Sequence, residues 1–184
     1  TIYIGKVENE YLEGHKHRKV FWGLTTLPQV VIDNHKVLIE DGQVFYIGNI
    51  KVEAILVPGH TWGHLVYLID DSYLFTGDTI WFGADGGYAF LNTLAEDRKL
   101  QCQSLQRLKE ILKKRKLQLK IITGHTGWTD DFIFAFAHID EICNSLKRKP
   151  KVHDPKAPFD GFDESEDTEE KARNGYLAQC YKAI

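Results

Sequence analysis

The first half of the chain alternates between apolar and polar positions in short runs, a pattern typical of half-buried β-strands. The runs are rich in valine and isoleucine, and turn sequences such as Asp41-Gly42, Gly48-Asn49 and 70–72 separate them. The predicted strands are 36–40, 44–48, 50–57, 65–69 and 73–75. Because the connections are short, we expect neighbouring strands to be antiparallel.

In the second half the apolar positions recur at the spacing of a helix. Leu94 and the apolar residues of 105–112 form one stripe, and the basic run 113–116 suits the C-terminal end of that helix. Residues 119–123 predict a short buried strand. A second amphipathic helix is predicted over 132–146, with Thr129 or Asp130 as its N-cap. Strands, helix, strand and helix in this order predict a mixed α/β (α+β) fold.

The amino-acid composition limits the classes of protein to which this chain can belong. The 184 residues suffice for one domain, and 43% apolar residues can form a hydrophobic core. A formal net charge of −3 argues against a dedicated nucleic-acid binder, so no nucleic-acid partner is expected. The three cysteines form no C-x-x-C pair and read as reduced structural thiols. No apolar run reaches the length of a membrane span, so we expect a cytoplasmic protein with no membrane partner.

The end of the chain differs from the rest in charge. Residues 151–184 carry the acidic excess, and three prolines mark the junction. We predict a main domain over 1–150, followed over 151–184 by an acidic connector and a C-terminal helix at about 168–182. The chain begins at Thr1 and contains no methionine, so it is expected to be processed, cut or part of a longer protein.

Three predicted strands end in the same way, with a glycine followed by a side chain that can bind a metal. These side chains are His60, Asp78 and His125. A residue just past the end of a strand is held in a fixed place, and the glycine lets the chain turn sharply there. Two imidazoles and one carboxylate suit zinc, iron or manganese. Each of the three alone is more often a turn residue, but three in one short chain indicate a metal site.

Longer motifs surround these residues: PGHTWGH at 58–64, FTGDT at 75–79 and TGH at 123–125. In residue sequence, order and approximate spacing they closely resemble the later motifs of the metallo-β-lactamase fold superfamily, over roughly residues 36–145. The resemblance implies an αββα sandwich built from two similar halves. It places these motifs in the second half of that fold.

The resemblance also implies roles for individual residues. His60 would bind a first metal, His125 a second, and Asp78, the catalytic carboxylate, would bridge the two, with two zinc ions per complete site. His64 would not be a ligand but would brace the loop. Hydrogen bonds within their turns are expected for two further residues, Thr61 and Thr79.

One motif of the superfamily is missing, the early H-x-H-x-D-H that normally supplies most of the metal ligands. The nearest sequence holds His15 and His17, but it lacks the D-H and follows a segment, 7–14, that reads as a helix. Both histidines are expected at the surface. The fold is therefore expected to be incomplete in its N-terminal half, with a metal site that is single or empty. A missing segment or a homo-oligomer would then cover the exposed face of the sheet.

By this resemblance we expect a metal-dependent hydrolase of small acyl compounds (a thioester, lactone or similar ester) that uses a metal-bound hydroxide. The motifs look like the glyoxalase II and lactonase type, so the expected partner is a small-molecule substrate. Four aromatic residues are candidates either for the substrate pocket or for the edge of the core: Trp81, Phe82, Tyr88 and Phe90. The alternatives are a non-catalytic binding or assembly module with a degenerate site and, less favoured, a redox di-iron relative.

Overall fold

The structure is a computed structural model that describes residues 1–20, 25–26, 31–32, 34–91 and 95–146. The strands are β1 (Ile2–Gly5), β2 (Lys19–Val20), β3 (Thr25–Thr26), β4 (Lys36–Ile39), β5 (Val44–Ile47), β6 (Ile50–Leu56), β7 (Leu65–Ile69), β8 (Tyr73–Gly77), β9 (Ile80–Gly83), β10 (Gly86–Ala89), β11 (Lys120–Thr123) and β12 (Trp128–Thr129). The helices are α1 (Lys6–Leu12), α2 (Arg98–Arg115), α3 (Phe132–Ala135) and α4 (Ile139–Ser145). The predicted connector and helix of 151–184 lie outside the described residues.

A six-stranded sheet in the order β12-β11-β8-β7-β6-β5 is the centre of the fold. Its neighbouring strands are antiparallel, as predicted, except that β11 runs parallel to β8. β9 and β10 form an antiparallel hairpin, and β1 pairs in parallel with β4. The predicted mixed α/β fold is confirmed, and each of the five strands predicted in the first half is present within a few residues of its predicted bounds.

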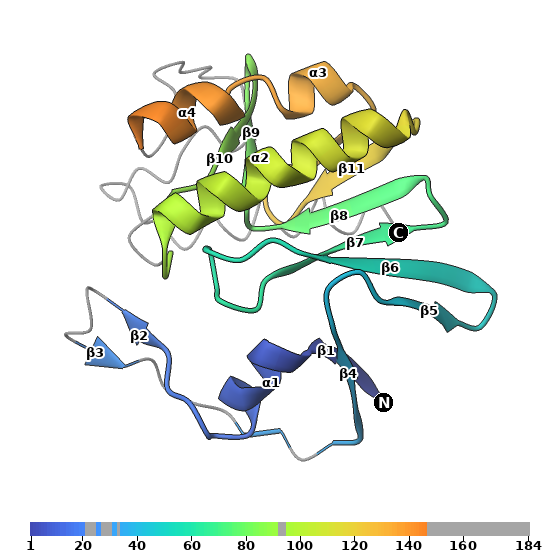
Figure 1. Cartoon of the computed structure of the whole chain (residues 1–184), viewed down its shortest axis with the longest axis vertical. Helices are drawn as coiled ribbons and strands as arrows, with labels where there is room; N and C mark the ends of the chain where they lie inside the picture. The colour runs from blue at the N-terminus through green and yellow to red at the C-terminus, as the bar shows by residue number, and fades with distance from the viewer. Residues whose placement is uncertain (21–24, 27–30, 33, 92–94, 147–184) are drawn as a thin grey trace, which may run out of the picture.

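The described helices of the second half, α2, α3 and α4, lie on one face of this sheet (Figure 1). Alternate residues of the central strands point into the core, among them Leu68, Leu74 and Ile121, which are at most 1% exposed. They belong to one buried cluster with Leu105 and Leu108 of α2, so this part of the apolar stripe read from the sequence packs on the sheet. The first member of the predicted stripe, Leu94, lies outside the described residues. None of the described helices is both long and apolar enough to cross a membrane.

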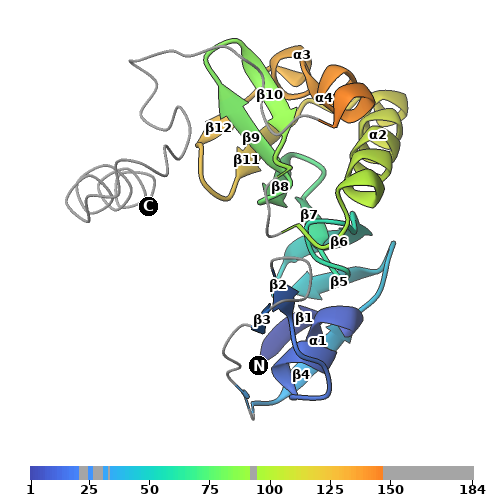
Figure 2. The ribbon, with the colours of Figure 1, turned by 90° about the vertical axis from the view of Figure 1, so that its left-hand side faces the viewer.

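The opposite face of the sheet is also apolar but is only partly covered. Tyr73 and Phe75 of β8 and Trp128 of β12 are 44%, 40% and 55% exposed. The register places Tyr67 beside Phe75, and Ile122 beside both Phe75 and Trp128, so these side chains lie on one face. Figure 2 shows α1, β1 and β4 beside the β5 and β6 end of the sheet. The described chain therefore holds one large sheet with a helix layer on a single face.

The predicted helix over 132–146 is wrong in two respects. It is divided into α3 and α4, and its N-cap is Asp131, whose carboxylate accepts from the N–H groups of Ile133 and Phe134 at 2.8 and 3.0 Å. At the break, the N–H of His138 donates to the carbonyl of Gly87 in the β9–β10 hairpin at 2.9 Å. A continuous helix would use that N–H internally, and a contact with a distant hairpin leaves no signal in the local sequence.

Candidate metal site

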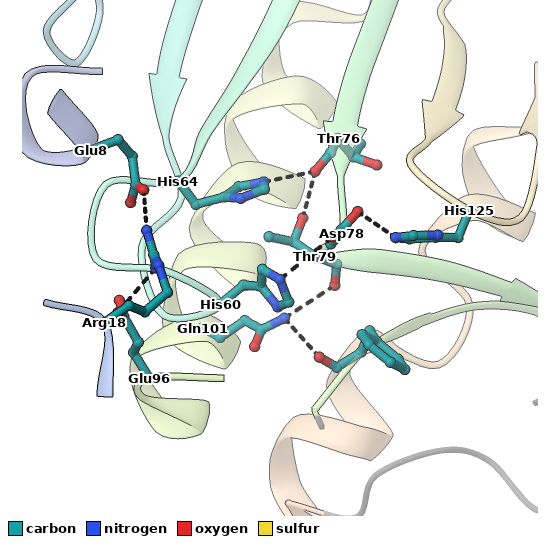
Figure 3. Close-up of polar contacts among 11 residues, drawn as sticks. Glu8, Arg18, His60, His64, Thr76, Asp78, Thr79, Glu96, Gln101 and His125 are labelled. Carbon is teal, nitrogen blue, oxygen red and sulfur yellow. Dashed lines mark hydrogen bonds and ion pairs between the residues drawn. The ribbon is translucent and has the colours of Figure 1, made fainter. Parts of the chain in front are cut away.

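Three of the predicted site residues meet at one edge of the sheet. β6, β8 and β11 run in the same direction, because β7 is antiparallel to both β6 and β8 and β11 is parallel to β8. Their C-terminal ends therefore lie on the same edge. His60 lies in the loop after β6, Asp78 directly follows β8, and His125 follows β11 (Figure 3). The three strand-glycine motifs thus converge on one edge of the sheet.

The Asp78 carboxylate lies between the two imidazoles. Its Oδ1 is 3.0 Å from His125 Nε2, and its Oδ2 is 3.6 Å from His60 Nε2. Gly124 is what allows this approach, since a Cβ at that position would lie only 2.3 Å from Asp78 Oδ1. The glycine of the TGH motif therefore makes room for the carboxylate of the TGDT motif.

Burial keeps the His60 ring neutral. Loss of hydration, and next the neighbouring His64, lower the pKa of His60 to about 4, although Asp78 opposes the shift. A neutral imidazole is the form that binds metals. Its Nδ1 is buried and has no hydrogen-bond partner among the described residues, so the ring is not committed to a hydrogen bond there.

His64 ties the same loop to β8. Its Nε2 lies 2.9 Å from the carbonyl of Thr76 and must carry the proton, because a carbonyl only accepts. Burial lowers the pKa of His64, so this ring is neutral too. Such a contact is what a bracing role requires. Thr79 Oγ1 also donates to the Thr76 carbonyl, at 3.0 Å, whereas Thr61 joins its turn through its main-chain carbonyl, which accepts from Gly59 and His64.

The three side chains do not form one cluster of metal donors. Over the described ranges, no three His, Cys, Asp or Glu side chains are grouped closely enough to hold one ion. The arrangement is instead pairwise, with one imidazole at each oxygen of a single carboxylate. Imidazole and carboxylate groups are donor types that zinc binds, so the residues present suit this metal. Further donors would have to come from elsewhere.

A cavity of about 610 Å³ opens beside this site. It is lined on one side by His60, Thr61 and Asp78 and on the other by residues of β1, α1 and the following segment, including Tyr3 and Tyr11. The space lies directly against two of the three candidate ligands. A small molecule bound there would contact the site.

The four aromatic candidates for the substrate pocket lie outside this cavity, although the Trp81 ring contacts the ring of His125 at 4.9 Å between centroids. Trp81, Phe82 and Tyr88 are buried in the core cluster, and Phe90, which stacks on Trp81 at 3.8 Å between ring centroids, packs against it. None of them lines the cavity. Their positions favour the structural alternative, and a role in binding substrate stays a prediction.

The two histidines that were expected at the surface, His15 and His17, lie there. His15, His17 and His35 are exposed, and the ring of His138 contacts Asp85 at 2.8 Å, away from Asp78. His153 is outside the described residues.

Four residues around the site were not found from the sequence: Glu8, Arg18, Glu96 and Gln101. Gln101 is fully buried and donates to the carbonyls of Phe90 and Thr79 at 3.1 and 3.4 Å, which fastens α2 to the segment after Asp78. A signal for it existed, since Gln101 occupies the apolar stripe of α2 at helical spacing from Leu105. The other three are charged residues far apart in the sequence, and no local pattern marks them.

Similarities to known proteins agree with this geometry. Over 90 residues the chain is 36% identical to a probable polyketide biosynthesis zinc-dependent hydrolase from Bacillus velezensis, covering 49% of this chain and 37% of that protein. Over 152 residues it is 28% identical to a hydroxyacylglutathione hydrolase from Pelagibacter ubique, covering 80% and 59%. The chain spans about half the length of the curated relatives it matches.

Solved structures show the same fold. A metallo-β-lactamase superfamily protein from Sulfolobus tokodaii matches with a TM-score of 0.56 at 17% identity, covering 99% of this chain and 70% of that one. A metallo-β-lactamase family protein from Thermus thermophilus matches with a TM-score of 0.51 at 16% identity, covering 79% and 52%. No family model matches the chain. The relatives and the fold agree with the resemblance seen in the motifs: the chain has the fold of the metallo-β-lactamase superfamily and is similar in sequence to proteins named as hydrolases.

Proposed function

We propose that this chain carries part of the metal site of a zinc-dependent hydrolase that acts on small acyl compounds, such as thioesters or lactones. The observation that supports it most is the Asp78 carboxylate, which has His60 at one oxygen and His125 at the other, on a single edge of the sheet. Relatives named as zinc-dependent hydrolase and hydroxyacylglutathione hydrolase support the same class of reaction.

In this proposal each residue has a separate role. His60 and His125 would each hold one zinc position, and Asp78 would belong to both. Bound zinc would supply a Lewis acid that activates water and polarises the acyl carbonyl. His64, fixed on the Thr76 carbonyl, would keep the loop of His60 at the end of β8. The substrate would occupy the cavity beside His60 and Asp78.

Metal loading of the whole chain tests the proposal. The purified chain is incubated with zinc, freed of loose metal and analysed for zinc, with iron and manganese in parallel. It is then assayed on a panel of thioesters and lactones. We expect one to two zinc ions per chain and measurable hydrolysis. A chain that retains no zinc, even from an excess, would contradict the proposal.

A second candidate is a binding or assembly module that keeps the fold with a degenerate site. It is supported by the absence, over the described residues, of three donors grouped for one ion. The two candidates separate in the same experiment, because the module would retain neither zinc nor hydrolytic activity.

The partly covered face of the sheet supports a further proposal, that copies of this chain associate through it unless another segment covers it. Tyr73, Phe75 and Trp128 form an exposed apolar surface that water solvates poorly. We expect the 184-residue chain to form oligomers in light scattering or to bind a hydrophobic dye. Phe75→Glu should reduce both effects. A compact monomer that binds no dye would contradict the proposal.

A further inference from the structure

The loop that carries His60 and His64 is held from outside by two carboxylates. Glu8 of α1 accepts from the main-chain N–H of Gly63 at 2.9 Å. Glu96, just before α2, accepts from the N–H of Trp62 at 2.5 Å. Two adjacent N–H groups of the PGHTWGH motif are therefore bound by side chains that are 55 and 34 residues away in the sequence.

One arginine joins these two carboxylates. The Arg18 guanidinium donates through Nη2 to Glu8 at 2.5 Å and through Nη1 to Glu96 at 3.0 Å (Figure 3). It also lies over the ring of Tyr11, 4.5 Å from the centroid. Each carboxylate thus uses one oxygen for the arginine and the other for the loop. Arginine suits this task because its planar donors reach two acceptors at once.

Burial makes the arginine necessary. The side chain of Glu96 is only 7% exposed, and those of Arg18 and Glu8 are 24% and 21% exposed. Two carboxylates this close and this poorly hydrated repel each other unless a cation lies between them. Without Arg18, we expect one of the two carboxylates to turn towards water, because this lowers their mutual repulsion. That movement would break its hydrogen bond with the N–H of Trp62 or Gly63.

The released loop would carry the site with it. The loop that Glu8 and Glu96 hold begins at His60 and ends at His64. The main-chain carbonyl of His60 also accepts from the N–H of Glu96, at 3.2 Å. Glu8 and Arg18 line the same cavity as His60 and Asp78, so two of the three charged residues face the same space as the site.

We propose that Arg18 is a positioning residue that, through Glu8 and Glu96, fixes the loop of His60 and His64 for metal binding. The proposal adds residues of the N-terminal segment to the site. It rests on the proposed function only for the part that concerns zinc; the part that concerns the loop stands on its own.

The test compares Arg18→Met with Arg18→Lys and with a matched control, Arg115→Met. Arg115 donates to both oxygens of Glu53 at 2.7 Å, at the opposite end of α2 from the loop, so the control removes an ion pair of the same kind elsewhere. Two readouts are used on the full chain: hydrogen exchange at Trp62 and Gly63, and zinc affinity in competition with a chromophoric chelator. Thermal unfolding shows that each variant is folded.

In Arg18→Met we expect exchange at these two amides to accelerate by roughly tenfold or more and zinc affinity to fall by roughly 10- to 100-fold, the usual range for residues that orient a ligand. Arg18→Lys should restore part of the protection from exchange and part of the zinc affinity. Arg115→Met should change neither the exchange at these amides nor the zinc affinity. If Arg18→Met does not fold, Glu96→Gln takes its place, because its amide oxygen still accepts from Trp62 but no longer pairs with the guanidinium as an ion.

Unchanged exchange at Trp62 and Gly63 would overturn the proposal, and so would faster exchange with unaltered zinc affinity. Equal effects in Arg115→Met would overturn it as well. A wild-type chain that binds no zinc would contradict the proposed function instead, and the exchange at the two amides would then decide alone whether Arg18 holds the loop.

Discussion

Asp78→Ala is expected to lower zinc affinity by about 100-fold or more, because the substitution removes the single carboxylate that both imidazoles share. In the proposed site each zinc position would lose one of its two donors from this chain. Any hydrolytic activity should be lost together with the metal. The measurement is zinc affinity by chelator competition, combined with a thioester assay of the zinc-loaded protein.

The stability of the Asp78→Ala variant should hardly change. Asp78 is 39% exposed, and partly solvated ion pairs of this kind contribute little, about 1 kcal/mol or less. Asp85→Ala is the matched control, since Asp85 also contacts a histidine, His138, at 2.8 Å but lies away from the site. Full zinc affinity and turnover in Asp78→Ala would show that the carboxylate has another role.

The site could be found from the sequence because its parts are local. Each of His60, Asp78 and His125 follows a glycine at the end of an apolar run, and strand direction alone brings such ends together at one edge. The alternating strands were equally readable, since one face of the sheet packs on α2 and its side chains must recur at every second position.

What the sequence did not reveal depends on contacts between distant segments. The hairpin of β9 and β10 is rich in glycine and has no strand-like pattern, yet its Gly87 carbonyl takes the N–H that would have continued α3 into α4. Likewise, Arg18 lies next to two expected surface histidines and looks like part of a solvated basic run. Only the approach of α1 to the loop after β6 gives it two partly buried carboxylate partners.

Gly59→Ala is expected to have the largest effect on stability, because this glycine is where the loop of His60 touches α2. Gly59 has a φ of +129°, and a Cβ there would lie 2.2 Å from the main-chain nitrogen of Gln101 and 2.4 Å from its Cα. Backbone atoms in a helix cannot move aside alone. The substitution must therefore separate the loop from the start of α2 and break the hydrogen bond from Asp97 N–H to the Gly59 carbonyl, 2.8 Å long.

We expect the free energy of unfolding to fall by about 3 kcal/mol or more, which corresponds to roughly 6–12 °C in melting temperature for a chain of this size. Gly42→Ala is the control, since Gly42 also has a positive φ, +73°, but a Cβ there meets nothing within 4 Å. It should cost only about 1 kcal/mol, the price of the left-handed backbone alone. The difference between the two variants in thermal or urea unfolding therefore measures the contact of the loop with α2. Equal losses of stability in the two variants would mean that the helix does not support the loop, and zinc affinity should then survive in Gly59→Ala. If the contact positions His60, zinc affinity should instead fall further in Gly59→Ala than in Gly42→Ala.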